Sequence, residues 1–225
     1  MTEYGYVVRD GAGGLGETDV QAAVNKQRST IVSWEPLEWI KAGRVFQALH
    51  GELTTPAAFE TDLVRQTPDL LVRVPAGVVI VPLYVKIDFE ATGAAVAQTL
   101  ISICNNDPGT SNMTAYTPTN ANTRYALNGS KVTAYVTNTG ATGTAPTGVF
   151  DLWRTYVQVD LDAVTGAANF DQSHYAPFFG RGVPAIVGST SNVNALLVYA
   201  GVGTSSTGYI NAAWAEFTYA EFYGS

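Results

Sequence analysis

One stretch of the sequence, residues 78–90, constrains the fold more than any other. It reads Val-Val-Ile-Val-Pro-Leu-Tyr-Val-Lys-Ile-Asp-Phe-Glu. In its second half Leu83, Val85, Ile87 and Phe89 alternate with Tyr84, Lys86, Asp88 and Glu90. A period of two places successive side chains on opposite faces of a β-strand, so this stretch predicts a long strand. Pro82 cannot donate a ladder hydrogen bond, and we therefore expect an edge, a bulge or a bend at that position.

The same period of two recurs from residue 46 onward. It predicts further strands at Phe46–Thr54, Leu70–Val74, Ala97–Cys104, Lys131–Thr137, Phe150–Leu161, Ala185–Val187, Ala195–Val202 and Tyr209–Tyr223. No ten-residue helical pattern separates these segments, which disfavours a βαβ architecture. The sequence also has no internal repeat of fixed period, which disfavours a propeller or a solenoid.

Long connections separate the predicted strands. Residues 105–123 are rich in Asn, Thr and Pro, residues 138–148 are rich in Thr and Gly, and residues 166–183 form a third connection. About eight antiparallel strands with long crossing loops are what a double Greek key requires. An immunoglobulin-type sandwich is the nearest competitor, but it usually fits in about 100 residues. We therefore predict an all-β chain with an eight-stranded antiparallel jelly-roll sandwich over residues 46–225.

Residues 1–45 depart from this pattern and predict a short N-terminal arm. Residues 11–16 are glycine-rich, and Thr18-Asp19-Val20-Gln21 after them has the spacing of a helix capping box. Apolar residues at helical spacing follow as far as residue 28. Pro36 can open a second helical turn over residues 37–40. The arm is therefore expected to be partly helical, with one or two short helices.

The charge of the chain bounds its partners. Only 14% of the residues are charged, against roughly 25% in typical soluble chains, and the net charge is −7. Nucleic-acid phosphates are bound mainly by clustered Lys and Arg, and no such cluster exists here, so direct binding of nucleic acid is not expected. A low-charge surface rich in small polar groups suits a protein covered by neighbours or carried on a particle. The sequence shows neither a secretory signal nor an apolar run approaching the ~18–20 residues of a membrane span.

Two short motifs suggest enzymes, and each lacks the surroundings that its chemistry needs. Gly11-Ala12-Gly13-Gly14-Leu15-Gly16 matches the dinucleotide-binding string G-x-G-x-x-G, but that site requires a parallel sheet built from βαβ units. Asp160-Leu161-Asp162-Ala163-Val164 matches the D-x-D-x-[TV] string of phosphoaspartyl transferases, whose chemistry requires magnesium and a doubly wound α/β fold. A strand end followed by a turn explains the second motif more simply.

Residue types that bind metals or act as nucleophiles are scarce. The only histidines are His50 and His174, and the sequence contains no His-x-His or Glu-x-x-His spacing. The single cysteine, Cys104, lies in an apolar strand and is expected to be a core thiol. We predict no catalytic, cofactor-binding or metal-binding residues, and therefore a protein that is not an enzyme and carries no cofactor.

Aromatic residues supply the remaining candidates for function. The chain has 12 Tyr and 4 Trp, and such rings on a β-sandwich can fill the core, stack on sugars or dock against a neighbour. Trp34 and Trp39 lie outside the predicted strands, and Tyr175, Phe178 and Phe179 lie in the loop that follows His174. We predict these five residues as subunit contacts, with a minor core as the alternative for the loop.

Taken together, these features resemble the single jelly-roll proteins of viral and phage virions, both capsid and capsid-decoration proteins. The resemblance covers about residues 46–223. It rests on the arm of 1–45, the strand at 78–90, the loops at 105–123 and 138–148 and the closing strand Tyr209–Tyr223. It implies self-assembly into a shell, with the arm reaching a neighbouring subunit. Many coat proteins of small RNA viruses carry a basic arm for the genome. The nearly neutral arm here instead favours a shell over an internal membrane or a decoration subunit on a preformed head.

The leading hypothesis is therefore a non-enzymatic structural virion protein that acts through symmetric subunit contacts. Its partners would be other copies of itself and other virion proteins, and it would be assembled in the host cytoplasm and reside in the virion. The alternative is a carbohydrate-binding β-sandwich, a lectin-like or host-attachment module with a glycan as ligand. An enzyme on a jelly-roll scaffold comes third, because acids, bases and metal ligands are scarce and scattered.

Overall fold

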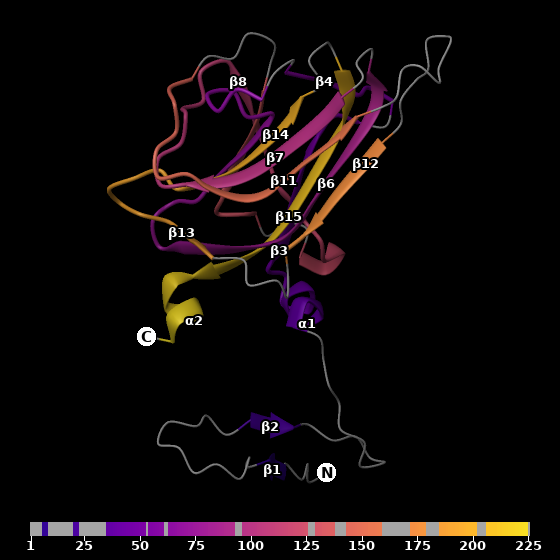
Figure 1. Cartoon of the computed structure of the whole chain (residues 1–225). Coiled ribbons are helices and arrows are strands. Elements are labelled where there is room, and N and C mark those ends of the chain that lie inside the picture. Colours follow the sequence, from indigo (N-terminus) through magenta and orange to yellow (C-terminus); the bar gives the residue numbers. More distant parts are fainter. Residues whose placement is uncertain are drawn as a thin grey trace.

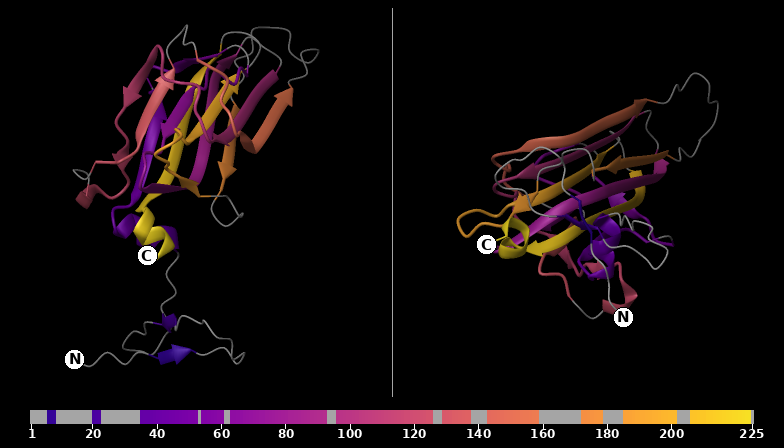
Figure 2. Two further views of the ribbon diagram at one scale, coloured as in Figure 1. Left: turned by 90° about the vertical axis from the view of Figure 1, so that its left-hand side faces the viewer. Right: turned by 90° about the horizontal axis from the view of Figure 1, so that it is seen from below.

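The structure of the chain is a computed structural model. It describes residues 6–8, 20–22, 35–52, 54–60, 63–92, 96–125, 129–137, 143–158, 172–178, 185–201 and 206–224. Most of these residues form two antiparallel sheets that pack face to face, so the predicted all-β sandwich is confirmed (Figures 1 and 2).

Each sheet combines strands from distant parts of the sequence. Sheet I has the order β11 (Phe150–Gln158), β7 (Val96–Cys104), β14 (Ala195–Gly201), β5 (Leu70–Arg73), β10 (Thr133–Thr137) and β8 (Met113–Tyr116). Sheet II has the order β12 (Gln172–Pro177), β6 (Val78–Thr92), β15 (Ser206–Thr218), β3 (Val45–His50) and β9 (Thr119–Asn120). Two short strands extend sheet II: β13 (Ile186–Val187) pairs with β6, and β4 (Ala57–Phe59) pairs with β15.

Eight of the strands pair in a nested order. β3 pairs with β15, β5 with β14, β6 with β12 and β7 with β11, in every case antiparallel. Along the chain the first of these strands therefore pairs with the last, and each inner strand with its counterpart. Sheet I holds two of the pairs and sheet II the other two, joined by the β7–β14 and β6–β15 pairings. One antiparallel ribbon folded across both sheets would have this connectivity.

The strand predicted at residues 78–90 forms β6 and contains the expected irregularity. Val85, Ile87 and Phe89 are buried on its inner face. Along β15, Ala213 pairs with Tyr84 but the next residue, Trp214, pairs with Pro82, so the register skips one residue of β6. Since a proline cannot donate to the ladder, a bulge beside it removes the need for that hydrogen bond. The expectation of an irregularity at Pro82 is confirmed.

The space between the sheets is filled by aliphatic side chains around one tryptophan. The largest fully buried members of this core are Trp214, Phe89, Leu70, Ile80, Ile87, Ile101, Leu196, Ile210 and Val72. Each such side chain contributes about 1.5–3 kcal/mol by its removal from water. The indole of Trp214 donates to Glu216 Oε1 over 2.9 Å, and Glu216 Oε2 accepts from the Lys131 backbone over 3.0 Å. These bonds satisfy a carboxylate that is itself buried.

A second, smaller core covers the outer face of sheet I. It consists of Leu71, Leu100, Cys104, Ala195, Leu197 and Tyr199, with Leu63, Met113, Tyr135 and Val149 packed against them. These residues alternate with those of the main core along β5, β7 and β14, as the period of two requires. Every residue of β14 is consequently buried. Burial on both faces explains why this strand reads as a continuous apolar run.

Two of the predicted loops contain strands, and the expectation of uninterrupted loops there is wrong. The connection at 105–123 holds β8 and β9, which pair with β10 and β3. The connection at 166–183 holds β12, which pairs with β6 along its whole length. All three strands are short and rich in polar residues. Their partners are distant in sequence, and partners of that kind override local preference.

The N-terminal arm is only partly as expected. Helix α1 spans Glu35–Lys41, so the helical turn opened by Pro36 is confirmed. The short 3₁₀ helix η1, at Thr123–Tyr125, lies outside the arm and follows β9. The helix expected from the capping box at 18–21 is wrong where the structure describes it. Val20–Ala22 form strand β2, which pairs with β1 (Tyr6–Val8). Valines favour such pairing because they are β-branched. None of the helices among the described residues is long and apolar enough to cross a membrane.

Candidate contact surface

Two short helices stand together at one end of the sandwich. Helix α1 precedes β3 in the chain, and α2 (Tyr219–Tyr223) continues directly from β15 (Figure 1). The Trp39 ring of α1 packs edge-on against Phe217, with 5.3 Å between the ring centroids. Side-chain amides of β9 and the turn after it hold the end of α1, because Asn122 donates to the Ile40 carbonyl over 2.9 Å and Asn120 to the Gly43 carbonyl over 2.7 Å.

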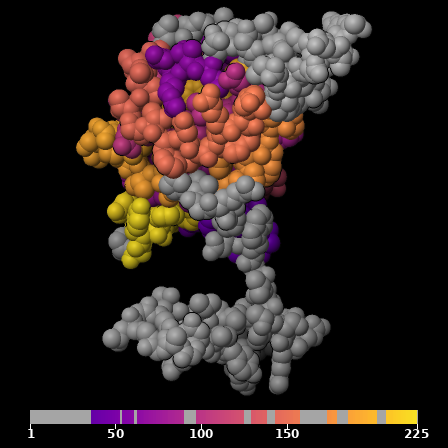
Figure 3. Space-filling view, in the orientation of Figure 1, coloured from indigo at the N-terminus to yellow at the C-terminus, as the bar shows by residue number. Residues whose placement is uncertain are grey.

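A chain of aromatic rings covers this end. Phe217 lies 5.8 Å from Phe222, Phe222 lies 5.0 Å from Tyr223, and Tyr223 lies 4.6 Å from Tyr219. We call Trp39, Phe217, Tyr219, Phe222 and Tyr223 the aromatic end. Tyr219, Phe222 and Tyr223 are 49%, 38% and 54% exposed. In Figure 3 the yellow C-terminal residues, which include α2, lie at the lower left of the coloured sandwich. A group of solvent-exposed aromatic rings of this kind is typical of a protein contact surface.

The local sequence explains why the chain turns into a helix here. The Thr218 hydroxyl accepts from the Glu221 backbone over 3.2 Å, and the Glu221 carboxylate accepts from the Thr218 backbone over 2.8 Å. This reciprocal pair is a capping box, and Gly224 ends the helix at a φ of 70°. The expectation of a strand as far as Tyr223 is therefore wrong beyond Thr218. Thr218-Tyr-Ala-Glu221 carries the capping signal, but the alternation of the preceding strand hides it.

One arginine fixes α2 to the sheet. Arg44 donates to Glu221 over 2.8 Å, and its guanidinium lies 5.3 Å from the Phe217 ring centroid. The hydrogen bond from Arg44 holds the pKa of Glu221 well below its usual range, and the same bond raises the pKa of Arg44. Sequence reasoning did not select Arg44 or Glu221, because they are 177 positions apart. Their contact follows from the pairing of β3 with β15.

Other ion pairs fasten loops over the outer face of sheet I. Arg65 donates twice to Asp151, over 2.9 and 2.8 Å, and the Ser102 hydroxyl donates to the same carboxylate. The Arg65 bonds lower the pKa of Asp151. Arg73 pairs with Asp107, and its guanidinium lies over the Tyr135 ring. The carboxylates of Asp151 and Asp107 are thus each held by several donors, which suits a structural role.

Asp69 is the most buried carboxyl group among the side chains that the structure describes, at 1% exposure. Burial raises its pKa to about 7, against the opposing effect of backbone N–H groups. Those donors are Ala200, which reaches Oδ2 over 2.7 Å, and Glu60, which reaches Oδ1 over 3.1 Å. Asp69 therefore joins the residue that follows β4 to β14, and its side chain is part of the scaffold. In the described part of the chain no three His, Cys, Asp or Glu side chains are grouped as a metal site requires.

The residues suggested by motifs have separate fates. Cys104 is buried and its pKa is raised to about 12, first by burial, so it is the core thiol expected from the sequence. His174 lies in β12 and not in a loop, and its Nδ1 is 2.8 Å from the Thr99 hydroxyl. The strings at 11–16 and 160–164 lie outside the described residues.

The three predicted contact residues that the structure describes, Trp39, Tyr175 and Phe178, do not form one patch. Trp34 and Phe179 lie outside the described residues. Trp39 is half-buried within the aromatic end. Phe178 is 3% exposed and belongs to the main core, so its ring offers no surface to a neighbour; for this residue the core alternative holds. Tyr175 is exposed on the outer face of sheet II, far from α2 along β6.

Tyr175 is part of a second aromatic feature, on the outer face of sheet II. Its ring lies 5.8 Å from that of Tyr84, and the Asn211 side chain hydrogen-bonds Tyr84. Lys86 stands in the row that joins Tyr175 to Asn211 and forms an ion pair with Asp88 over 2.7 Å. We call Tyr84, Tyr175, Asn211, Lys86 and Asp88 the tyrosine face. Flat rings beside amide and charged groups can stack on sugars and hydrogen-bond their hydroxyls.

Comparison with known proteins identifies no relative for this chain. No family model matches it, no curated protein matches it, and no solved structure matches it.

Proposed function

We propose that this chain is a structural virion protein, a shell or decoration subunit that works through contacts with other subunits and not by catalysis. The observation that carries the proposal is the aromatic end. Interfaces are enriched in Tyr, Trp and Phe, and a few buried aromatic residues usually supply most of their binding energy. Three exposed rings on one turn of helix are suited to that role.

The arrangement of the strands supports the same assignment. The nested pairing of eight strands in two sheets is the order expected of a jelly roll, with a short arm before it. The arm enters the domain through α1, directly beside the aromatic end. An arm that reaches a neighbouring subunit and a surface that receives one would then lie next to each other. The proposed partners are other copies of the chain and other virion proteins, and the proposed location is the virion.

The charge of the chain supports protein partners over a genome. With 12 basic and 19 acidic residues, the surface attracts phosphate backbones poorly. In the described part of the chain Arg44, Arg65 and Arg73 each pair with a carboxylate. This leaves shape and aromatic contact as the means of recognition.

The proposal is tested by measuring self-association. We expect the purified chain to form oligomers or particles in light scattering and negative-stain imaging. The triple variant Tyr219→Ser/Phe222→Ser/Tyr223→Ser should weaken association roughly 100-fold, because contact aromatics typically contribute more than about 1 kcal/mol each. The matched control is Phe150→Ser/Tyr156→Ser, which removes rings on β11 that are 59% and 68% exposed. A wild-type chain that stays monomeric at all concentrations and joins no particle would refute the proposal.

The tyrosine face favours a second function, that of a carbohydrate-binding module. The neighbouring rings of Tyr84 and Tyr175 offer an apolar platform. Lys86 and Asp88 beside them offer a charged donor and acceptor on the same face. Screening of the wild type on a glycan array, with Tyr175→Ala as the variant, decides between the two. Saturable glycan binding that Tyr175→Ala abolishes, in a monomeric protein, would favour this second function.

A further inference from the structure

Both histidines of the chain lie in a single row across sheet II. His50 on β3 pairs with Ile210 on β15, Ile210 pairs with Ile87 on β6, and Ile87 pairs with His174 on β12. Directly paired residues of adjacent strands point to the same face of a sheet. Ile87 and Ile210 are fully buried in the main core, so all four side chains face the opposite sheet. We call these four residues the histidine row.

The two histidines close the row at its margins. Three strand spacings of about 4.8 Å separate His50 from His174, or roughly 14 Å across the sheet. β12 is the outer strand of sheet II, and β9 covers β3 only at Phe46 and Gln47. At the level of the row, therefore, each histidine stands on an outermost strand among the described residues.

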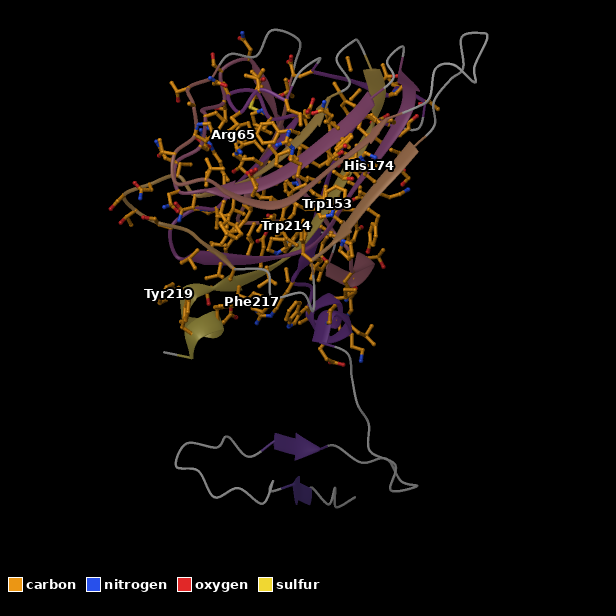
Figure 4. The ribbon with its side chains drawn as sticks, in the orientation of Figure 1. Arg65, Trp153, His174, Trp214, Phe217 and Tyr219 are labelled. Carbon is orange, nitrogen blue, oxygen red and sulfur yellow. The ribbon has the colours of Figure 1, made fainter. Side chains whose placement is uncertain are left out.

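Aromatic rings surround both imidazoles. Phe59 lies 6.3 Å from His50, and Phe89 lies 5.6 Å from Phe59 and 5.3 Å from His174. Trp153, from β11 of the opposite sheet, lies 6.2 Å from His174 (Figure 4). The two imidazoles are only 8% and 5% exposed. Such surroundings accept a neutral ring readily and a charged ring at high cost.

Each imidazole has a nitrogen atom that the interior leaves unsatisfied. The Nε2 atoms of both histidines are buried and have no hydrogen-bond partner among the described residues. Nδ1 of His174 shares a hydrogen bond with the Thr99 hydroxyl. A neutral imidazole can leave one nitrogen as an unused acceptor. An imidazolium has two N–H donors and needs an acceptor for each.

No carboxylate stands ready to stabilise a charged ring in the row. Lys86 and Asp88 of β6 alternate with Ile87 and lie on the outer face, paired with each other. The other charged side chains described on the strands packed against the row, or just beyond their ends, are Asp151 and Arg154 on β11, Glu216 on β15, Arg44 and Glu52 at the two ends of β3, and Glu60 after β4. Asp151 is paired with Arg65, Glu216 accepts from the Trp214 indole, and Arg44 is paired with Glu221. The buried Asp69 accepts from the Glu60 backbone. Burial alone lowers the pKa of both imidazoles, and none of these charges contributes to that shift.

We propose that the histidine row is an acid-sensitive lock, in which the two neutral imidazoles seal the margins of the core and their protonation opens this end of the sandwich. The device is independent of the proposed function, because it follows from the interior of a single chain. In a shell of such subunits, it would loosen the sandwich on acidification while leaving the aromatic end in place.

The direction of the effect follows from the titration of the two groups. Burial lowers the pKa of His50 to about 4 from an ordinary 6.5, and it lowers the pKa of His174 as well. A histidine whose pKa falls on folding stabilises the fold above pH 6.5, and this contribution is lost as the pH falls toward 4. For His50 alone, the loss between pH 7 and pH 5 is roughly a 20-fold change in the unfolding equilibrium constant.

Asp69 acts in the opposite direction and fixes the design of the experiment. Its pKa is raised to about 7, so it stabilises the fold as the pH falls through that range. The test is therefore a comparison with His50→Phe/His174→Gln, which keeps Asp69 but contains no histidine. Phenylalanine suits the aromatic surroundings of His50. Glutamine keeps an amide near the Thr99 hydroxyl and cannot be protonated in this range.

Urea unfolding of both proteins at pH 7 and pH 5 gives the decisive quantity. On acidification, the unfolding constant of the wild type should rise at least roughly 20-fold relative to that of the histidine-free variant. Equal changes in the two proteins would overturn the proposal. If the double variant fails to fold, the imidazole proton resonances of the wild type decide instead. In the folded protein they should show the His50 ring neutral down to pH 5 and the His174 ring titrating below the ordinary pKa of 6.5. Titration of both rings near 6.5 without loss of structure would overturn the lock.

Discussion

The two ends of the sandwich use the same kinds of side chain for opposite purposes. At the aromatic end the rings of Tyr219, Phe222 and Tyr223 are exposed, and a charged pair, Arg44 and Glu221, holds them in place. At the histidine row the rings of Phe59 and Phe89 are buried around groups that must stay neutral. The difference shows that an aromatic cluster alone says little about function. What decides is whether the cluster is buried and whether charge is allowed beside it.

The largest expected effect comes from removing one phenylalanine at each end. Phe89→Ala should lower the free energy of unfolding by about 3–5 kcal/mol, because it leaves a cavity in the main core. Phe222→Ala should lower it by less than about 1 kcal/mol, since its ring is 38% exposed, but should weaken self-association. Urea unfolding and light scattering of the two variants measure both quantities. Similar losses of stability in the two variants would remove the contrast between the ends.

The structural elements that depend on local sequence pattern were predicted correctly. The alternation at 78–90 predicted β6, and Pro82 predicted its bulge, because both signals lie within one strand. The turn opened by Pro36 predicted α1 for the same reason. Periodicity and proline act over a few residues, so they can be recognised without knowing the neighbouring strands.

The parts that were missed depend on partners far away in the sequence. β12 is polar and ends in a proline, and only its pairing with β6 makes it a strand. For that reason His174 was expected in a loop, and the histidine row was not predicted. The row requires the register of four strands, which no local signal contains. Phe178 was expected at a contact surface and lies in the core for the same reason, because its backbone bonds to Leu83 of β6.

Acidification should weaken the sandwich at the histidine row and leave the aromatic end unchanged. Between pH 7 and pH 5 protonation of the exposed imidazoles favours the opened state of the histidine row, whereas Glu221, with a lowered pKa, stays ionised and bonded to Arg44. A carboxylate with a lowered pKa loses its contribution only as the pH falls below its ordinary value of about 4.5. Hydrogen exchange, corrected for the intrinsic effect of pH, should show protection falling roughly 20-fold in β3 and β12 relative to the histidine-free variant.

The same exchange data give the control for this prediction. The exchange protection of the amides in α2 and in the last residues of β15 should change by the same factor in the wild type and in His50→Phe/His174→Gln. A fall in protection that begins at α2, or that spreads evenly over both sheets, would contradict an acid-sensitive end.

A smaller effect is expected from the helix cap at the aromatic end. Thr218→Ala removes the hydroxyl that accepts from the Glu221 backbone, which should lower the free energy of unfolding by about 1 kcal/mol. The control is Thr207→Ala, near the other end of β15, which removes a hydroxyl without removing a cap. Because α2 carries the exposed rings, Thr218→Ala should also weaken self-association. Wild-type association in this variant would mean that the rings act without the helix.

The smallest effect belongs to the pair that fastens α2. The side chains of Arg44 and Glu221 are 33% and 43% exposed, so solvent screens their attraction and a double-mutant cycle with Arg44→Gln and Glu221→Gln should give about 0.5 kcal/mol. Arg44→Gln should lower the free energy of unfolding slightly more than Glu221→Gln, because it also removes the guanidinium from the face of Phe217. The coupling should fall in 1 M salt, where the Debye length is about 3 Å, while the ring contact remains. A coupling that salt leaves unchanged would place the bond in a drier setting than its exposure indicates, as contact with a second subunit would.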